Sequence, residues 1–147
     1  MLEKLKKNLS KILLLLLIFS LGINYYQYDK DKMNKVNQKN QITSGLLTIS
    51  GRGPNIANNS NDFAQVYAAI KEIQTCNFYF TDRKGISEDE INSSLPILLV
   101  NFETLILNDK EKMAKIFIDT DISSILVDIS NNLDDKEAIK KAIYLVK

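Results

Sequence analysis

The chain has 147 residues with a formal net charge of +1, contains no histidine and has one cysteine, Cys76. Without histidine, a serine–histidine or cysteine–histidine nucleophile pair is excluded, and a zinc site, which normally recruits cysteine or histidine, is not expected. A single cysteine cannot close an intramolecular disulfide, so packing has to hold the fold together.

A basic leader and an unbroken apolar run open the chain. The leader, residues 1–11, has four lysines against one acid. Eight apolar residues follow it without interruption, an arrangement typical of membrane-targeting segments. Aromatic residues shortly after them would lie at the headgroup layer of a bilayer, which amphipathic rings prefer. The residues assigned to this membrane anchor are Ile12, Leu13, Leu14, Leu15, Leu16, Leu17, Ile18, Phe19, Tyr25, Tyr26 and Tyr28.

Residues 12–28 reach the roughly 17 residues at the lower limit for a membrane-spanning helix. They predict a signal-anchor that contacts membrane lipid. Because an excess of lysine stays cytoplasmic, we expect residues 1–11 to lie inside and the chain after Tyr28 to lie outside the cytoplasm. The alternative is a signal peptide cleaved after Gly22, since Ser20 and Gly22 have the spacing of a cleavage site. Cleavage would release a secreted or periplasmic binding module, but the polar region that usually precedes such a site is missing.

A polar stretch, residues 29–44, follows the apolar segment. Its apolar members, Met33, Val36 and Ile42, are too few for a coiled-coil seam. We interpret it as a tether, helical in its first turns, that leads to an exported globular domain over residues 45–147. The leader holds four of the basic residues, so the remaining chain has a slight excess of acids. This balance argues against a nucleic-acid partner, which requires a basic face.

A strand–helix–strand unit is predicted at the start of the exported domain. Residues 45–51 alternate apolar and polar side chains between two glycines, which indicates a short strand. Residues 62–75 have an apolar stripe at steps of three and four, which indicates a helix with Asp62 capping its first turn. Residues 77–81 are aromatic and indicate a second strand. We interpret Cys76 as a buried small apolar residue at the end of the helix.

The second half of the chain favours helices but contains an ambiguous stretch. Ser87 and Glu90 form a capping box that predicts a short helix over residues 88–93. Residues 95–130 suit helices and strands alike, and over 95–107 the helical stripe is the preferred interpretation. A final amphipathic helix is expected after Asp134, which would cap it. Together these elements predict an α+β domain, with a mostly α domain as the alternative.

Carboxylates are the remaining catalytic candidates. Asp119 and Asp121 flank Thr120, and Asp134 and Asp135 are adjacent, so a pair of the kind that glycosidases use is conceivable. Both pairs also stand where helix caps are expected, and capping explains them without chemistry. We therefore expect no catalytic residue, no cofactor and no metal, with a carboxylate-dependent hydrolase as a less favoured alternative.

The sequence leads to one preferred hypothesis for the function. In this hypothesis the protein is a single-pass membrane protein of the cell envelope, and its small extracytoplasmic domain binds another envelope protein as a non-catalytic assembly subunit. The arrangement of a short tail, one span, a tether and a compact domain supports this hypothesis, although such an arrangement does not identify the partner.

Overall fold

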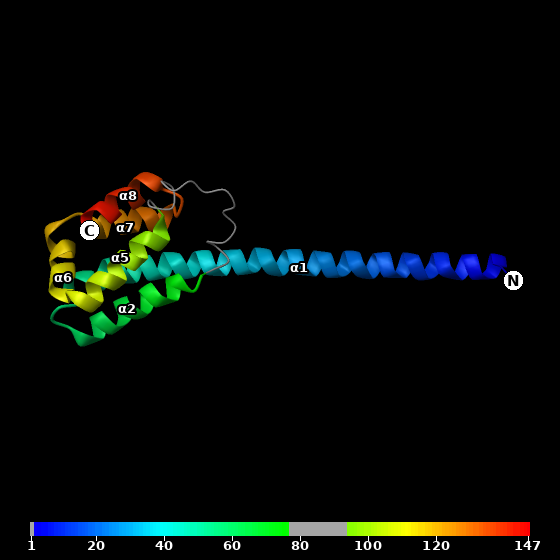
Figure 1. Ribbon diagram of the computed structural model, residues 1–147, viewed down its shortest axis with the longest axis horizontal. Coiled ribbons are helices and arrows are strands. Elements are labelled where there is room, and N and C mark those ends of the chain that lie inside the picture. Colours follow the sequence, from blue (N-terminus) through cyan, green and yellow to red (C-terminus); the bar gives the residue numbers. More distant parts are fainter. Residues whose placement is uncertain (1, 77–93) are drawn as a thin grey trace. The chain divides into compact units, whose positions relative to one another are not determined.

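The computed structural model describes residues 2–76 and 94–147, and the regular elements of these residues are all helices (Figure 1). In chain order they are α1 (Leu2–Arg52), the short 3-10 helix η1 (Gly53–Asn55), α2 (Ser60–Gln74), α5 (Leu95–Asn108), α6 (Lys110–Asp119), α7 (Ile122–Asn131) and α8 (Lys136–Leu145).

The prediction of an α+β fold is wrong, because residues 45–51 belong to helix α1 and form no strand. Burial shows why the helix prevails: Ile42, Leu46 and Ile49, at steps of four and three, are fully buried, whereas Leu47 is 45% exposed. The helical spacing of the buried residues therefore determines the structure, and the alternation of apolar and polar residues around Leu47 does not indicate a strand. The second predicted strand, 77–81, and the predicted helix 88–93 lie outside the described residues. The described residues adopt the all-α alternative.

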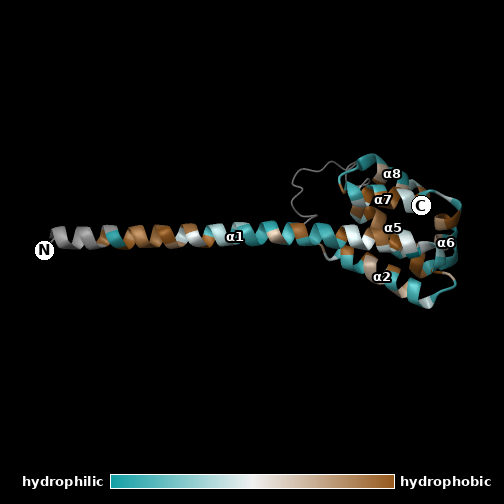
Figure 2. Cartoon of the chain, turned by 180° about the vertical axis from the view of Figure 1, so that it is seen from behind, coloured by the Kyte–Doolittle hydropathy of each residue, from teal (hydrophilic) through white to brown (hydrophobic). Residues whose placement is uncertain are grey.

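Two compact units make up the chain, residues 1–36 and residues 37–147, and each is described by itself. The first consists of the N-terminal part of α1. In Figure 2 this part of the helix shows a hydrophobic stretch that is followed by a hydrophilic one. The second unit contains the end of α1 and the remaining helices, which pack around one hydrophobic core.

The core of residues 37–147 is built from helix stripes that face one another. α2 lies along α5, α5 also contacts α6 and α8, and α7 pairs with α8 (Figure 1). Phe102 of α5 is fully buried and stacks on Phe117 of α6, with ring centroids 5.9 Å apart. The largest fully buried side chains are Phe102, Ile42, Leu46, Ile49, Ile56, Ile70, Ile73, Leu98, Leu99, Ile106, Met113 and Ile122.

The end of α1 pairs with α7 through small hydroxyl side chains. The Thr43 hydroxyl donates to the carbonyl of Ser130 at 3.2 Å, and the Ser50 hydroxyl donates to the carbonyl of Ser123 at 2.9 Å. The Ser123 hydroxyl in turn donates to the carbonyl of Ser50 at 3.2 Å. Because Thr43 meets Ser130 and Ser50 meets Ser123, the two segments run antiparallel. The short side chains let the two backbones come close enough for these bonds.

The ambiguous stretch 95–130 is helical throughout its regular elements, α5, α6 and α7. In α5 the helical stripe that the spacing predicts is buried, and Pro96 lies in the first turn, where its missing N–H is tolerated. The buried residues of this stripe are Leu95, Leu98, Leu99, Phe102, Leu105 and Ile106. The preference for a helix over 95–107 is thus confirmed.

Two expected caps are displaced along the chain. Asn59 caps α2 in place of Asp62, its side-chain oxygen accepting from the N–H groups of Asn61 and Asp62 at 3.0 and 3.2 Å. Asp62 is 6% exposed and its carboxylate pairs with the Arg52 guanidinium at 2.5 Å, which links the end of α1 to α2. Asp135, the neighbour of Asp134, caps α8 by accepting from the N–H of Ala138 at 3.0 Å.

Candidate functional site

The most prominent exposed apolar surface of the described residues lies on α1 between residues 12 and 28. The residues of the predicted membrane anchor are all more than half exposed, from 54% at Ile12 to 73% at Tyr25. Soluble proteins rarely expose a contiguous apolar surface of this kind unless it contacts a membrane or a partner. Residues 12–28 would cover about 26 Å at about 1.5 Å per residue, close to the roughly 30 Å hydrocarbon thickness of a bilayer.

The described helix near the N-terminus is long and apolar enough to cross a membrane, and no part of its most apolar stretch is buried in the protein. Its length and composition are compatible with a single-pass membrane anchor and with a signal peptide.

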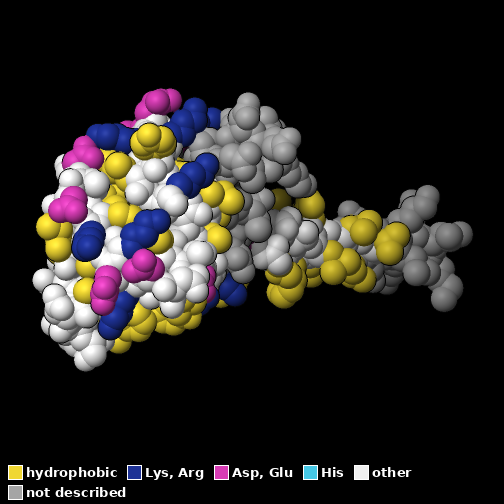
Figure 3. All heavy atoms as spheres, turned by 60° about the vertical axis from the view of Figure 1, so that its left-hand side comes forward, with side chains coloured by type: hydrophobic (Ala, Val, Ile, Leu, Met, Phe, Trp, Pro, Cys, Tyr) yellow, Lys and Arg dark blue, Asp and Glu magenta, His cyan; other side chains and the backbone are white. Residues whose placement is uncertain are grey.

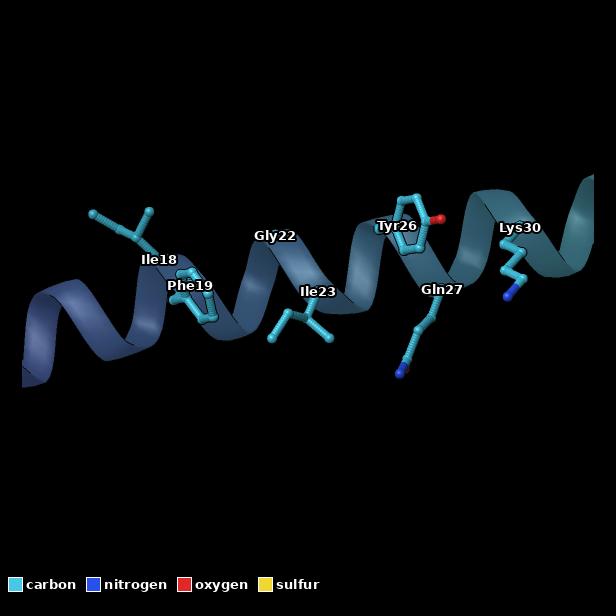
Figure 4. A pocket seen from close by; sticks show the side chains of 7 residues that line it. All are labelled: Ile18, Phe19, Gly22, Ile23, Tyr26, Gln27 and Lys30. Atoms are coloured by element: carbon cyan, nitrogen blue, oxygen red, sulfur yellow. The ribbon is translucent and has the colours of Figure 1, made fainter.

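A shallow hollow lies on the surface of α1 within the apolar segment (Figure 4). It arises at Gly22, where a Cβ atom would meet no other atom within 4 Å. Larger side chains rise around it on the same helix, so the hollow is a gap in the helix surface and not an enclosed ligand cavity. The lining residues are Ile18, Phe19, Gly22, Ile23, Tyr26, Gln27 and Lys30.

A second, more polar groove lies between α7 and α8. Ile125 and Ala138 contribute its apolar part, and Tyr144 is 81% exposed at its edge. Most of the charged side chains that line this groove form ion pairs or cap a helix. Lys141 forms an ion pair with Asp121, Lys140 lies 3.8 Å from Glu137, and Asp135 caps α8. The remaining lining residue is Asp128, whose backbone carbonyl accepts the N–H of Asn132 at 3.0 Å.

The carboxylates that the sequence presents as catalytic candidates occupy helix ends. Asp119 is the exposed last residue of α6, and Asp121 stands at the N-terminal boundary of α7. The Asp121 side chain forms no cap; the Thr120 hydroxyl oxygen accepts the N–H of Ile122 at 3.3 Å. The Lys141 ammonium, which donates to the Asp121 carboxylate, lowers the pKa of Asp121 below its ordinary value. The described residues contain no group of three or more cysteine, aspartate or glutamate side chains placed to hold a metal ion.

Cys76 is 1% exposed just after α2, so its interpretation as a buried small residue is confirmed. Its Sγ lies 3.6 Å from the carbonyl oxygen of Glu72 and 3.6 Å from Oε1 of Gln41. Burial, followed by the nearby charge of Glu72, raises the pKa of this thiol. The thiolate, which is the nucleophilic form, is thereby disfavoured.

The sequence interpretation missed an apolar surface on the outer side of α5. Val100 and Leu107 are 50% and 57% exposed, seven residues apart on one face, and Thr104 lies exposed between them. The signal was available: residues 95–107 are apolar on nearly every face, and a helix of this unit can bury only one side. The face in Figure 3 carries basic, acidic and apolar side chains side by side.

No protein-family model, curated protein or solved structure matches the chain.

Proposed function

We propose that the protein is a single-pass membrane protein of the cell envelope whose helical unit, residues 37–147, is an extracytoplasmic, non-catalytic assembly subunit. The exposed apolar run Ile12–Phe19 behind a lysine-rich leader is the observation that carries this proposal. The proposal puts the N-terminal tail in the cytoplasm, because an excess of lysine favours that side, and it puts Tyr25, Tyr26 and Tyr28 at the outer end of the span.

The free energy of burying apolar side chains favours a bilayer over water as the environment of the apolar run. Fully burying one large apolar side chain is worth about 1.5–3 kcal/mol. Eight such side chains therefore represent about 12–24 kcal/mol, at least as large as the whole folding stability of a typical domain. An aqueous environment would leave this amount unrealised, because the run is not buried in the protein.

The outer face of α5 supports the second part of the proposal, a protein partner. Val100, Thr104 and Leu107 make an uncharged surface in a chain in which a quarter of the residues are charged. Depletion of charged residues is typical of the centre of a protein–protein interface. We assign this face, defined by these three residues, to contact with another envelope protein.

Site-specific photocrosslinking in membranes of the host tests the partner. A photoreactive residue at position 107 should give one discrete adduct, and the same residue at Glu111, which is exposed on α6, should not. Val100→Glu should abolish the adduct at 107 without changing the helix content measured by circular dichroism, since Val100 is half exposed. Equal adducts at 107 and 111, or an adduct that survives Val100→Glu, would contradict the assignment of this face.

A further inference from the structure

Besides the tyrosines near its outer end, the apolar segment contains three polar side chains: Ser20, Asn24 and Gln27. They are four and three residues apart, and a helix turns about 100° per residue, so they share one face of α1. All three are exposed. Leu13 and Leu17 continue the same face toward the N-terminus, and no charged residue lies between Lys11 and Asp29.

The depth of Ser20 and Asn24 in the proposed span makes the exposure of these two side chains to lipid unfavourable. Ser20 is in the middle of residues 12–28, and Asn24 is about 6 Å from the outer end at about 1.5 Å per residue. Hydrocarbon chains offer no hydrogen-bond partner to a hydroxyl or a carboxamide. In membrane helices such side chains are usually covered by another helix, with which they form hydrogen bonds.

We propose that α1 pairs in the bilayer with a second copy of this chain, in parallel, through the face of Ser20, Asn24 and Gln27. The inference rests on the proposed membrane function. Two copies inserted in one orientation are parallel, and a twofold axis then sets each residue opposite its equivalent. A carboxamide is self-complementary, because it has two N–H donors and an acceptor oxygen, so Asn24 can bond to the same residue of the second copy.

The spacing of the face also fits a helix pair of this kind. Steps of four and three residues are those of a coiled-coil seam, in which a buried asparagine specifies register and a parallel pair. Because the segment contains no charge, no like-charge repulsion opposes contact between two identical faces. A second copy therefore satisfies the polar groups without requiring any other sequence.

Disulfide crosslinking of the full chain in vesicles of phosphatidylcholine and phosphatidylglycerol tests the pairing. In a Cys76→Ala background, Leu13→Cys lies on the proposed face and Leu15→Cys, at similar depth, lies about 200° around the helix. Oxidation should give disulfide-linked dimers of the Leu13→Cys chain and few of the Leu15→Cys chain. Adding Asn24→Leu should lower the Leu13→Cys dimer roughly threefold to tenfold, the change expected from losing one interhelical hydrogen bond.

Flotation of the same vesicles separates the two proposals. A chain that floats with the vesicles but crosslinks equally at positions 13 and 15, or not at all, overturns the pairing and leaves the anchor intact. A dimer that Asn24→Leu does not weaken also overturns the pairing through the polar face. A chain that fails to float overturns the membrane function and the pairing together.

Discussion

At the scale of single residues, two glycines of α1 stand in opposite surroundings. A Cβ at Gly45 would lie 2.7 Å from Cδ1 and Cγ1 of Ile73, which is fully buried in α2. A Cβ at Gly51 would meet nothing within 4 Å. Glycine at position 45 thus permits the close approach of α1 and α2, whereas position 51 has no such requirement.

These surroundings predict opposite effects of alanine. Gly45→Ala should lower the free energy of unfolding, because overpacking costs about 1–3 kcal/mol and outweighs the helix propensity gained. Gly51→Ala should raise it by about 0.4–1 kcal/mol by restricting the unfolded chain. Urea unfolding followed by circular dichroism measures both. If the two variants changed stability in the same direction, the contact between Gly45 and Ile73 would not be as described.

A cross-helix ion pair predicts acid sensitivity at the same scale. The Lys71 ammonium donates to the Glu103 carboxylate, and Gln74 donates to it at 2.8 Å, so the two bonds lower the pKa of Glu103 below its ordinary value of 4.5. The stabilisation of the folded state by the ionised Glu103 carboxylate is therefore present above about pH 4.5. It is lost as the pH falls through the lower pKa that Glu103 has in the folded state. Glu103→Gln should flatten the acid limb of the unfolding free energy measured between about pH 6 and pH 3. An acid limb as steep as that of the parent chain would show that the pair contributes nothing.

At the scale of elements, the N-cap of α6 predicts different stability effects for substitutions at two aspartates. Asp109 accepts the N–H of Lys112 at 2.8 Å and is the N-cap of α6, whereas Asp119 is its exposed last residue. Asp109→Ala should reduce the free energy of unfolding by about 0.5–2 kcal/mol, and Asp119→Ala by less than about 0.5 kcal/mol. Thermal unfolding of the two variants measures the difference. A larger loss from Asp119→Ala would mean that the helix boundary is wrongly placed.

The elements show how far local sequence patterns reach. The stripe of α5 was predictable because six apolar residues repeat at helical steps over a long window. Residues 45–51 were predicted as a strand because seven residues are too few to separate the two-residue period of a strand from the 3.6-residue period of a helix. Ile42, whose burial completes the helical stripe, lies outside that window. The observed capping residues differ from the predicted ones because several serine, asparagine and aspartate residues lie close to each helix start. Only the backbone geometry selects among them.

At the scale of the whole molecule, the exposed apolar run of α1 was the most predictable feature. The apolar run and its lysines are local features that require no tertiary contact to recognise. The composition of residues 95–107 indicates that α5 exposes an apolar side, but which side stays exposed was not predictable, because it depends on the packing of α2, α6 and α8 against the helix. The identity of a partner depends on a surface outside this chain.

The anchor predicts a large effect of charge within the apolar run. Lysine at the centre of a membrane helix costs about 2.5–3.5 kcal/mol, so Phe19→Lys combined with Leu21→Lys, on either side of the midpoint at Ser20, should shift the chain from the membrane to the soluble fraction. Tyr144→Lys, at a position that is 81% exposed on α8, should leave the distribution unchanged. Carbonate extraction and quantification of both fractions measure the shift. If the double variant stayed in the membrane, residues 12–28 would not be the anchor.

The most direct test of the membrane function is the intact mass of the protein recovered from membrane and soluble fractions of its host. The anchored form predicts a chain of 16.7 kDa, which retains residues 12–28, in the membrane fraction alone. A shorter chain that begins at Ile23 and is soluble would contradict the anchor. It would show instead that residues 1–22 are a cleaved signal peptide and that the helical unit functions as a free exported domain.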